Sequence, residues 1–339
     1  MQERLSDFDE HHREHVGQTL QVRARNVGRE LGLPELSIKF EGGNPTGTQK
    51  DRIAFAFVKD ALARGYDTIT VATCGNFGCA VAHAASRAGL QSILYMPRSY
   101  TARRVQEMVG AGGKLESVDG EYEEAVYTSE KHAQAHGWYN ANPGNGSAAV
   151  ALPAYGTIAD EIVQALGAAP AAVAVPVSNG TTLAGIFHGF SELQRRGVVE
   201  RLPQMVAASS HQKNPIIKSF QEGHQRCMDL DPAVVKETRV NEPLINWHAF
   251  DGDLALAALR QSGGMAEFVS DRWMTTYARL LRELEGLDAL PASTSSLRAL
   301  VKLKQKGELP PGPQVAVITG RRGASALRVA GTDAVAEEH

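Results

Sequence analysis

The sequence predicts an α/β fold made of doubly wound open sheets with helices on both faces. Three observations predict it. Short runs rich in β-branched residues alternate along the chain with segments of helix length. Apolar residues make up 43% of the 339 residues, which is enough to bury a core in about two domains. Glycine is frequent, with 33 residues, and much of it separates these runs.

Each element follows from its local composition. Six runs have the length and character of buried strands; they are residues 69–73, 92–97, 114–118, 172–178, 203–209 and 314–319. Five segments between them have helix length; they are residues 54–65, 80–90, 101–113, 120–137 and 182–197. Because strand and helix alternate, the chain is expected to wind back and forth across its sheets.

Composition and charge exclude several classes of protein. Lys plus Arg number 35 against 38 Asp plus Glu, a net charge of −3 without a basic stripe, which argues against a nucleic-acid partner. No apolar run reaches the roughly 18 residues of a membrane span, and the first 15 residues are polar where a secretory signal is apolar. We therefore expect a cytoplasmic protein with no membrane partner.

A metal site is not expected either. The three cysteines are an odd number and lack the paired spacing of zinc ligands or of a disulfide framework. His11 and His15 are four residues apart, as are His132 and His136, but no third ligand accompanies either pair. Solvated helix faces explain both pairs better.

Three glycine-containing loops stand at the end of a strand or just before a helix, where open parallel sheets bind ligands. The first, residues 41–52, delivers Lys50 to the start of an apolar helix. The positive end of a helix dipole disfavours the charged form of an amine, and a partly neutral lysine can act as a nucleophile. Lys50 is thus a candidate for Schiff-base chemistry, although this loop alone suits a solvated lysine equally well.

The other two loops suit anions. Residues 73–78 follow a strand and lead into a helix, so their backbone N–H groups can bind a carboxylate, and Asn76 offers both a donor and an acceptor. Residues 178–182 combine a helix N-terminus, a glycine and three hydroxyl groups, which suits a phosphate. An ordinary Ser or Thr helix cap has the same composition. We expect the three loops to converge on one pocket.

Together these loops resemble the threonine synthase-like branch of the fold-type II pyridoxal-phosphate enzymes, in the tryptophan synthase beta superfamily. GGNPTGTQKDR at 42–52 resembles the family's N-P-T-G-S-F-K-D-R, with Gln49 in place of Phe. TCGNFG at 73–78 resembles its T/S-S-G-N-T-G loop, and PVSNGTTLAGI at 176–186 its P-V-G-N phosphate loop. Residues 283–300 and 317–323 resemble two further family segments, so the likeness spans roughly residues 17–325.

The resemblance implies a pyridoxal 5′-phosphate cofactor bound to Lys50 as a Schiff base. It also implies that Asn76 lies beside the ring hydroxyl of the cofactor and that Thr319 faces its pyridine nitrogen. The third loop would hold the cofactor phosphate through Ser178, Asn179, Gly180, Thr181 and Thr182. The second loop would hold the substrate carboxylate through Thr73, Cys74, Gly75 and Phe77, where Cys74 and Phe77 replace residues that usually carry hydroxyls.

The activity implied is that of a carbon–oxygen lyase acting on a small amino acid, threonine synthase-like, which converts O-phosphohomoserine to threonine and phosphate. A cysteine- or cysteate-synthase-like β-replacement and a serine or threonine deaminase are alternatives. A non-catalytic protein that binds the cofactor or another metabolite is an alternative from a different class. A neutral hydroxyl at the ring nitrogen favours elimination, but threonine synthases carry an equivalent hydroxyl, so Thr319 does not decide the reaction.

One segment departs from the threonine synthase pattern. That pattern usually has N-P-x-R near residues 142–145, with an arginine that contacts the substrate phosphate, whereas this chain has no arginine between Pro143 and Glu161. The candidates to replace it are Arg103, Arg104, Lys213 and Lys218, each of which also suits a solvated surface charge.

The resemblance further implies two domains and a homodimer. Residues 1–44 and 156–339 would form the larger, cofactor-binding domain, and residues 45–155 a smaller domain inserted in it.

Overall fold

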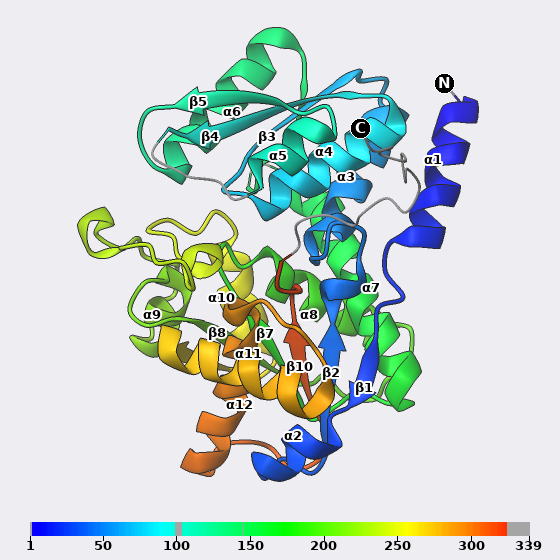
Figure 1. Ribbon diagram of the computed structural model, residues 1–339. Helices are drawn as coiled ribbons and strands as arrows, with labels where there is room; N and C mark the ends of the chain where they lie inside the picture. Colours follow the sequence, from blue (N-terminus) through cyan, green and yellow to red (C-terminus); the bar gives the residue numbers. More distant parts are fainter. Residues whose placement is uncertain (1, 99–103, 145, 324–339) are drawn as a thin grey trace, which may run out of the picture.

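A computed structural model describes residues 2–98, 104–144 and 146–323, and it contains two sheets flanked by helices (Figure 1). The strands are β1 Gln21–Arg23, β2 Leu36–Phe40, β3 Thr68–Ala72, β4 Gln91–Pro97, β5 Lys114–Val118, β6 Tyr139–Asn140, β7 Ala172–Pro176, β8 Gln204–Ser210, β9 Met265–Val269 and β10 Gln314–Ile318. The helices are α1 Gln2–His15, α2 Arg25–Glu30, α3 Lys50–Ala63, α4 Asn76–Ala88, α5 Val105–Gly110, α6 Tyr122–His136, α7 Ala148–Leu166, α8 Thr181–Arg195, α9 Pro215–Gln221, α10 Gly252–Gln261, α11 Asp271–Glu285 and α12 Ser295–Lys306. The predicted fold class is confirmed.

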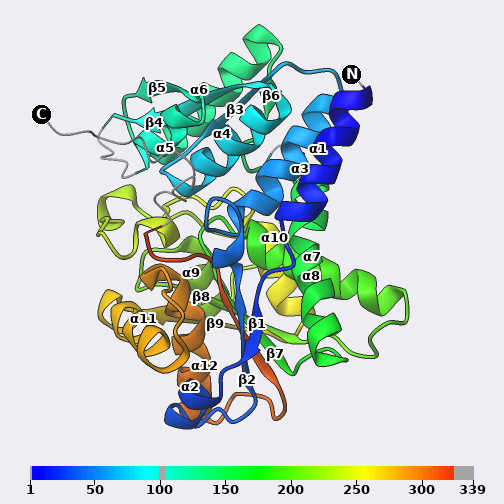
Figure 2. The ribbon, with the colours of Figure 1, turned by 45° about the vertical axis from the view of Figure 1, so that its right-hand side comes forward.

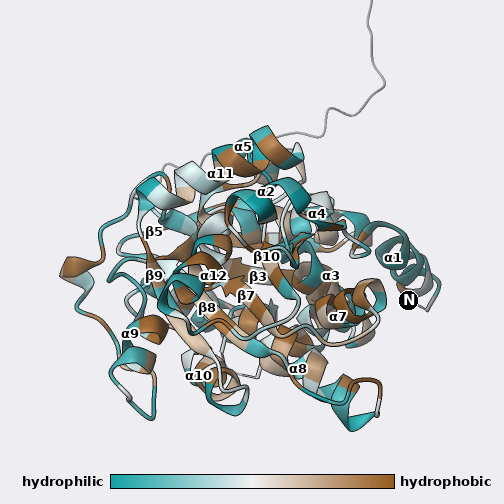
Figure 3. Ribbon diagram, turned by 90° about the horizontal axis from the view of Figure 1, so that it is seen from below, coloured by the Kyte–Doolittle hydropathy of each residue, from teal (hydrophilic) through white to brown (hydrophobic). Residues whose placement is uncertain are grey.

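The larger sheet has six strands in the order β1-β2-β10-β7-β8-β9. All neighbours are parallel except β1 and β2, which pair antiparallel at one edge. Helices α2, α11 and α12 cover one face, and α7, α8, α9 and α10 cover the other (Figure 2). Because both faces are covered, the central strands β7, β8 and β10 are mostly apolar (Figure 3).

The smaller sheet has four parallel strands in the order β5-β4-β3-β6. Helix α6 covers one face, and α3, α4 and α5 cover the other. The two sheets form two lobes, one above the other in Figure 1. Strands of the smaller sheet all come from residues 45–155, while α1 lies against α3 and α4. The domain limits given above stay a prediction.

Several elements differ from the sequence-based expectation. Strands β2 and β9 were not predicted, because each carries a charged residue, Lys39 or Glu267, that is typical of a solvated segment. Both charges are buried and paired: Lys39 with Glu161, and Glu267 with two lysines of α12. The helix expected at 101–113 is shorter, since α5 spans Val105–Gly110 and residues 101–103 lie outside the described residues.

Helices α7 and α8 cross so closely that their backbones are in contact at Gly156 and Gly189. A Cβ added at Gly156 would lie 3.2 Å from the Cα of Gly189, and one added at Gly189 would overlap the carbonyl oxygen of Gly156. Glycine is required here by close approach, because both residues have ordinary helical backbone angles. The crossing holds the start of α8 at a fixed position relative to α7.

We predict that Gly189→Ala lowers the free energy of unfolding by about 1–3 kcal/mol, because the added methyl group must push the two helices apart. The matched control is Gly110→Ala, in helix α5, where a Cβ meets nothing within 4 Å. That variant should be neutral or slightly more stable. Urea unfolding of both variants checks this; equal midpoints would show that the crossing tolerates a side chain.

Candidate functional site

The three glycine-containing loops converge on one pocket between the two lobes. Its walls come from the carboxyl ends of β3, β7 and β10 and from the N-termini of α3, α4 and α8. The lining includes every residue that the resemblance assigned to the cofactor or to the substrate carboxylate: Lys50, Thr73, Cys74, Gly75, Asn76, Phe77, Ser178, Asn179, Gly180, Thr181, Thr182 and Thr319. Three helix N-termini at one pocket create a field that favours anionic groups.

Lys50 is the first residue of α3 and is the only lysine or arginine in the described lining of the pocket. Its Nζ lies 5.5 Å from the centre of the Phe77 ring. Burial lowers the pKa of Lys50 to about 8, against an opposing effect of the Asp251 carboxylate. Burial is therefore the main cause, where the sequence suggested the helix dipole. Roughly one amine in ten is neutral at pH 7 with such a pKa.

The loop before Lys50 is held by the chain that follows β10. Gln49 donates its backbone N–H to the carbonyl oxygen of Thr319 at 2.9 Å, and Arg321 donates its own to the carbonyl oxygen of Gly47 at 3.0 Å. The hydroxyl of Thr319 lies 2.9 Å from that of Ser293. The hydrogen bond between Gln49 and Thr319 thus holds Thr319 next to the residue that precedes Lys50.

The Asn76 loop is shaped by Thr73. The hydroxyl oxygen of Thr73 accepts the backbone N–H groups of Gly75 at 3.0 Å and Gly78 at 2.8 Å, which folds the loop tightly into α4. Gly75 has φ of 150°, and a Cβ there would meet nothing within 4 Å. The loop therefore leaves open space over Gly75, where a ligand can approach the backbone.

The third loop, residues 178–182, forms hydrogen bonds with residues 246–251. The side-chain oxygen of Asn179 accepts from Asn246 at 3.2 Å and from the backbone of Phe250 at 3.3 Å, and Thr181 donates its hydroxyl to Asp251 at 2.5 Å. Gly180 has φ of 94°, and none of the described side chains caps α8. The first N–H groups of this helix have no intrahelical acceptor, so they are available to an anion.

Three further residues at the site were not predicted. Tyr122, the first residue of α6, lines the pocket beside the third loop, and burial raises its pKa above the usual range, so the phenol is neutral. Asp251 is buried behind Thr181, where burial raises its pKa. Glu242 also lines the pocket. No sequence pattern marks these residues, since each is brought to the site by a segment far from the three loops.

Arg104, Lys213 and Lys218, which were considered as replacements for the missing arginine, are not among the described residues that line the pocket. Arg104 is only 7% exposed and bonds to protein groups, so it is not the solvated charge that the sequence allowed. Lys213 donates to the carbonyl oxygen of Lys236, and Lys218 is exposed near Glu222. Arg103 lies outside the described residues.

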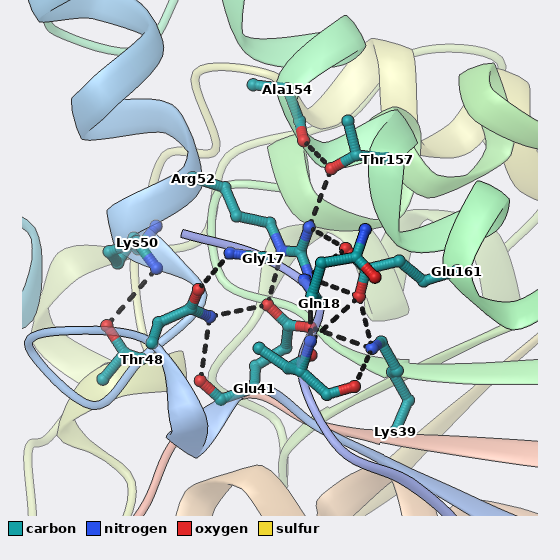
Figure 4. A network of polar contacts seen from close by, with 12 residues as sticks. Gly17, Gln18, Lys39, Glu41, Thr48, Lys50, Arg52, Ala154, Thr157 and Glu161 are labelled. Carbon is teal, nitrogen blue, oxygen red and sulfur yellow. Dashed lines mark hydrogen bonds and ion pairs between the residues drawn. The ribbon is translucent and has the colours of Figure 1, made fainter. Parts of the chain in front are cut away.

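A buried ion-pair network anchors the helix that begins with Lys50 (Figure 4). Arg52 donates to Glu41 at 2.6 and 2.8 Å and to Glu161 of α7 at 2.7 and 2.9 Å. Lys39 of β2, fully buried, lies 2.5 Å from Glu161. Despite their burial, these cations hold the pKa of Glu41 below its usual range and that of Glu161 at about 2. The network fixes α3 against β2 and α7.

The described residues contain no group of three His, Cys, Asp or Glu side chains placed to hold a metal ion. None of the described helices combines the length and the apolar character needed to cross a membrane. None of the described cysteines, Cys74, Cys79 and Cys227, forms a disulfide bond.

The chain is similar to known proteins over most of its length. A family model described as pyridoxal-phosphate dependent enzyme matches residues 12–320. The chain is 31% identical over 314 residues to threonine synthase of Methanocaldococcus jannaschii, an overlap of 91% of this chain and 75% of that protein. Two solved structures have the same fold. The processed threonine deaminase isoform 2 of Solanum lycopersicum gives a TM-score of 0.76 at 16% identity, covering 94% of this chain and 89% of its own. Diaminopropionate ammonia lyase of Escherichia coli gives a TM-score of 0.77 at 16% sequence identity, and the match covers 95% of this chain and 89% of that chain.

We predict that Glu161→Gln lowers the free energy of unfolding at pH 7 by about 3–5 kcal/mol, because two buried cations lose a counter-charge. A carboxyl group whose pKa is lowered from 4.5 stabilises the fold above that value and loses this effect as the pH falls toward about 2. The stability gap between wild type and variant should therefore narrow from pH 5 to pH 3.

The matched control is Glu192→Gln, which removes an exposed partner of Arg195. It should leave the free energy of unfolding unchanged. Denaturant unfolding as a function of pH measures all three proteins, and a Glu161→Gln variant as stable as the control at pH 7 would contradict the anchoring role of the network.

Proposed function

We propose the function from one premise: the chain belongs to the family of pyridoxal-phosphate dependent enzymes. Its cofactor is pyridoxal 5′-phosphate, and among these enzymes it is threonine synthase-like, as its motifs predicted. The proposal concerns the reaction. We propose a carbon–oxygen lyase that acts on the side chain of a small amino acid, and the observation that carries it is the buried, partly neutral Lys50 amine amid three anion-binding loops.

The residues present suit this cofactor. The uncapped N-terminus of α8 offers backbone N–H groups to a phosphate, and the space over Gly75 accommodates a bound molecule. Lys50 supplies an amine that can bond to the aldehyde carbon. When bound, the cofactor supplies an electron sink for negative charge that develops on the amino acid.

Each of the remaining roles in the reaction would fall to a residue of the chain. The Lys50 amine would act as the general base that removes the proton from the α-carbon of the amino acid, which the lowered pKa of Lys50 permits. Asn76 would contact the ring hydroxyl, and Ser178, Asn179, Gly180, Thr181 and Thr182 would hold the phosphate. Thr319, paired with Ser293, would offer a neutral hydroxyl to the ring nitrogen.

The substrate carboxylate would lie on the second loop. Thr73, Cys74, Gly75 and Phe77 line the pocket, and the N–H groups in the first turn of α4 would receive the carboxylate. Tyr122 and Glu242 also line the pocket, and Tyr122 lies close to both Cys74 and Asn179.

Two reactions remain in this proposal. The similarity to threonine synthases favours conversion of O-phosphohomoserine to threonine and phosphate. The described lining favours a second candidate, a serine or threonine deaminase, because it offers a phosphate only one cationic side chain, Lys50. A cysteine- or cysteate-synthase-like β-replacement ranks behind both.

The setting of the enzyme is also part of the proposal. We propose a cytoplasmic homodimer with a small amino acid as its substrate and without a nucleic-acid or membrane partner. The balanced charge and cysteines that form no disulfide bond among the described residues support this setting.

We predict that Lys50→Ala abolishes covalent attachment of the cofactor and lowers turnover by at least about 10³-fold, because no other amine lies in the described pocket. In the wild type, the borohydride-reducible adduct should form more readily as the pH rises through about 8, since Lys50 then becomes neutral. Mass spectrometry after reduction locates the adduct.

Lys218→Ala is the matched control, because Lys218 is exposed on α9. It should retain both the adduct and turnover. A Lys50→Ala variant that still carries a reducible adduct and turns over amino acids would overturn the assignment of Lys50.

A panel of amino acids separates the candidate reactions. Release of inorganic phosphate from O-phosphohomoserine with threonine formation is expected of the threonine synthase-like reaction, and release of ammonia from serine or threonine of the deaminase. Absence of any spectral change of the bound cofactor with every amino acid would instead favour a non-catalytic binding protein.

A further inference from the structure

Arg104 lies at the junction of three segments that surround the pocket. Its Nη1 donates to the side-chain oxygen of Asn76 at 2.9 Å, and its Nη2 donates to the carbonyl oxygen of Thr46 at 2.9 Å. Nη2 also lies 2.6 Å from a carboxylate oxygen of Glu107, one turn farther along. Arg104 thus connects the start of α4, the loop that precedes Lys50, and α5.

The chemistry of the guanidinium group fixes the orientation of the Asn76 amide. A guanidinium carries only donors, so Asn76 can face Arg104 only with its carbonyl oxygen. The amide NH2 group is then on the other side of the planar amide. Because Asn76 lines the pocket while Arg104 does not, the pocket receives the two N–H donors of Asn76 rather than its acceptor.

The ion pair with Glu107 and the burial of Arg104 stabilise this orientation of the Asn76 amide. Arg104 is 7% exposed, and its ion pair with Glu107 compensates the charge of the guanidinium. The Glu107 carboxylate accepts hydrogen bonds from Nε and Nη2 of Arg104, which leaves Nη1 to donate to Asn76. Rotation of the amide would place its NH2 group against the guanidinium, donor against donor, and leave a buried hydrogen bond unmade.

We propose that Arg104 is a positioning residue for the cofactor: it holds Asn76 so that the amide NH2 donates to the ring oxygen of pyridoxal phosphate and favours the ionised form of that oxygen. This inference rests on the proposed contact between Asn76 and the cofactor ring. Arg104 itself touches neither cofactor nor substrate, and it acts only through Asn76. It is therefore distinct from the substrate-phosphate contact that the sequence suggested for it.

The experiment compares Arg104→Met, Asn76→Ala, the double variant and Arg279→Met, all loaded with pyridoxal phosphate. Arg279 pairs with Glu283 on the exposed face of α11 and serves as the matched control. The readout is the ratio of the two absorbance bands that report the ionised and protonated ring oxygen, measured at one pH without substrate. Thermal unfolding is recorded for each variant.

We expect Arg104→Met and Asn76→Ala each to lower the ratio of ionised to protonated form by roughly tenfold, as loss of one charge-assisted hydrogen bond predicts. The double variant should match Asn76→Ala alone, because Arg104 has no route to the ring except through Asn76. Arg279→Met should keep the wild-type ratio.

The possible failures are distinguishable. If Asn76→Ala lowers the ratio and Arg104→Met does not, the role of Arg104 is wrong and the proposed function stands. If neither changes the ratio, the contact of Asn76 with the ring is wrong as well. Additive shifts in the double variant would also overturn the inference. Should Arg104→Met fail to fold, Glu107→Gln tests the same geometry and should give a smaller shift in the same direction.

Discussion

The position of Lys50 depends on the buried ion pairs that Arg52 forms two residues later. Arg52 forms ion pairs with Glu41, the first residue of the lysine loop, and with Glu161 of α7. Lys39 of β2 also pairs with Glu161. Buried charges tolerate few alternative geometries, because any displacement leaves a charge without its partner. The network therefore fixes where α3 begins, and with it the place at which the amine enters the pocket.

The remaining walls are assembled around that fixed point. The chain after β10 pairs with the lysine loop through Gln49 and Gly47, and Arg104 ties the same loop to Asn76 through the carbonyl oxygen of Thr46. The N-terminus of α8 is held by its glycine crossing with α7, the helix that also carries Glu161. Each ligand-binding loop is thus connected, directly or through one helix, to the element that carries Lys50.

The sequence predicted the fold class and the three loops because both leave local signals: apolar runs of strand length, and glycine with hydroxyl or amide residues at their ends. It missed β2 and β9 because Lys39 and Glu267 are buried by partners far away in the chain. Asp251 and Arg104 were missed or misplaced for the same reason, since long-range partners decide their burial. Local patterns predict elements and loops, whereas buried polar contacts emerge only in three dimensions.

The place of β10 in the larger sheet has a consequence for how the chain acquires its shape during synthesis. This strand is the last along the described residues, yet it lies between β2 and β7, near the middle of the sheet. Until the ribosome has released β10, the antiparallel pair of β1 and β2 cannot join the rest of the larger sheet. The lysine loop then also lacks its hydrogen bond to the backbone of Thr319. The smaller sheet can form early from contiguous chain, but the pocket around Lys50 is completed only when β10 inserts.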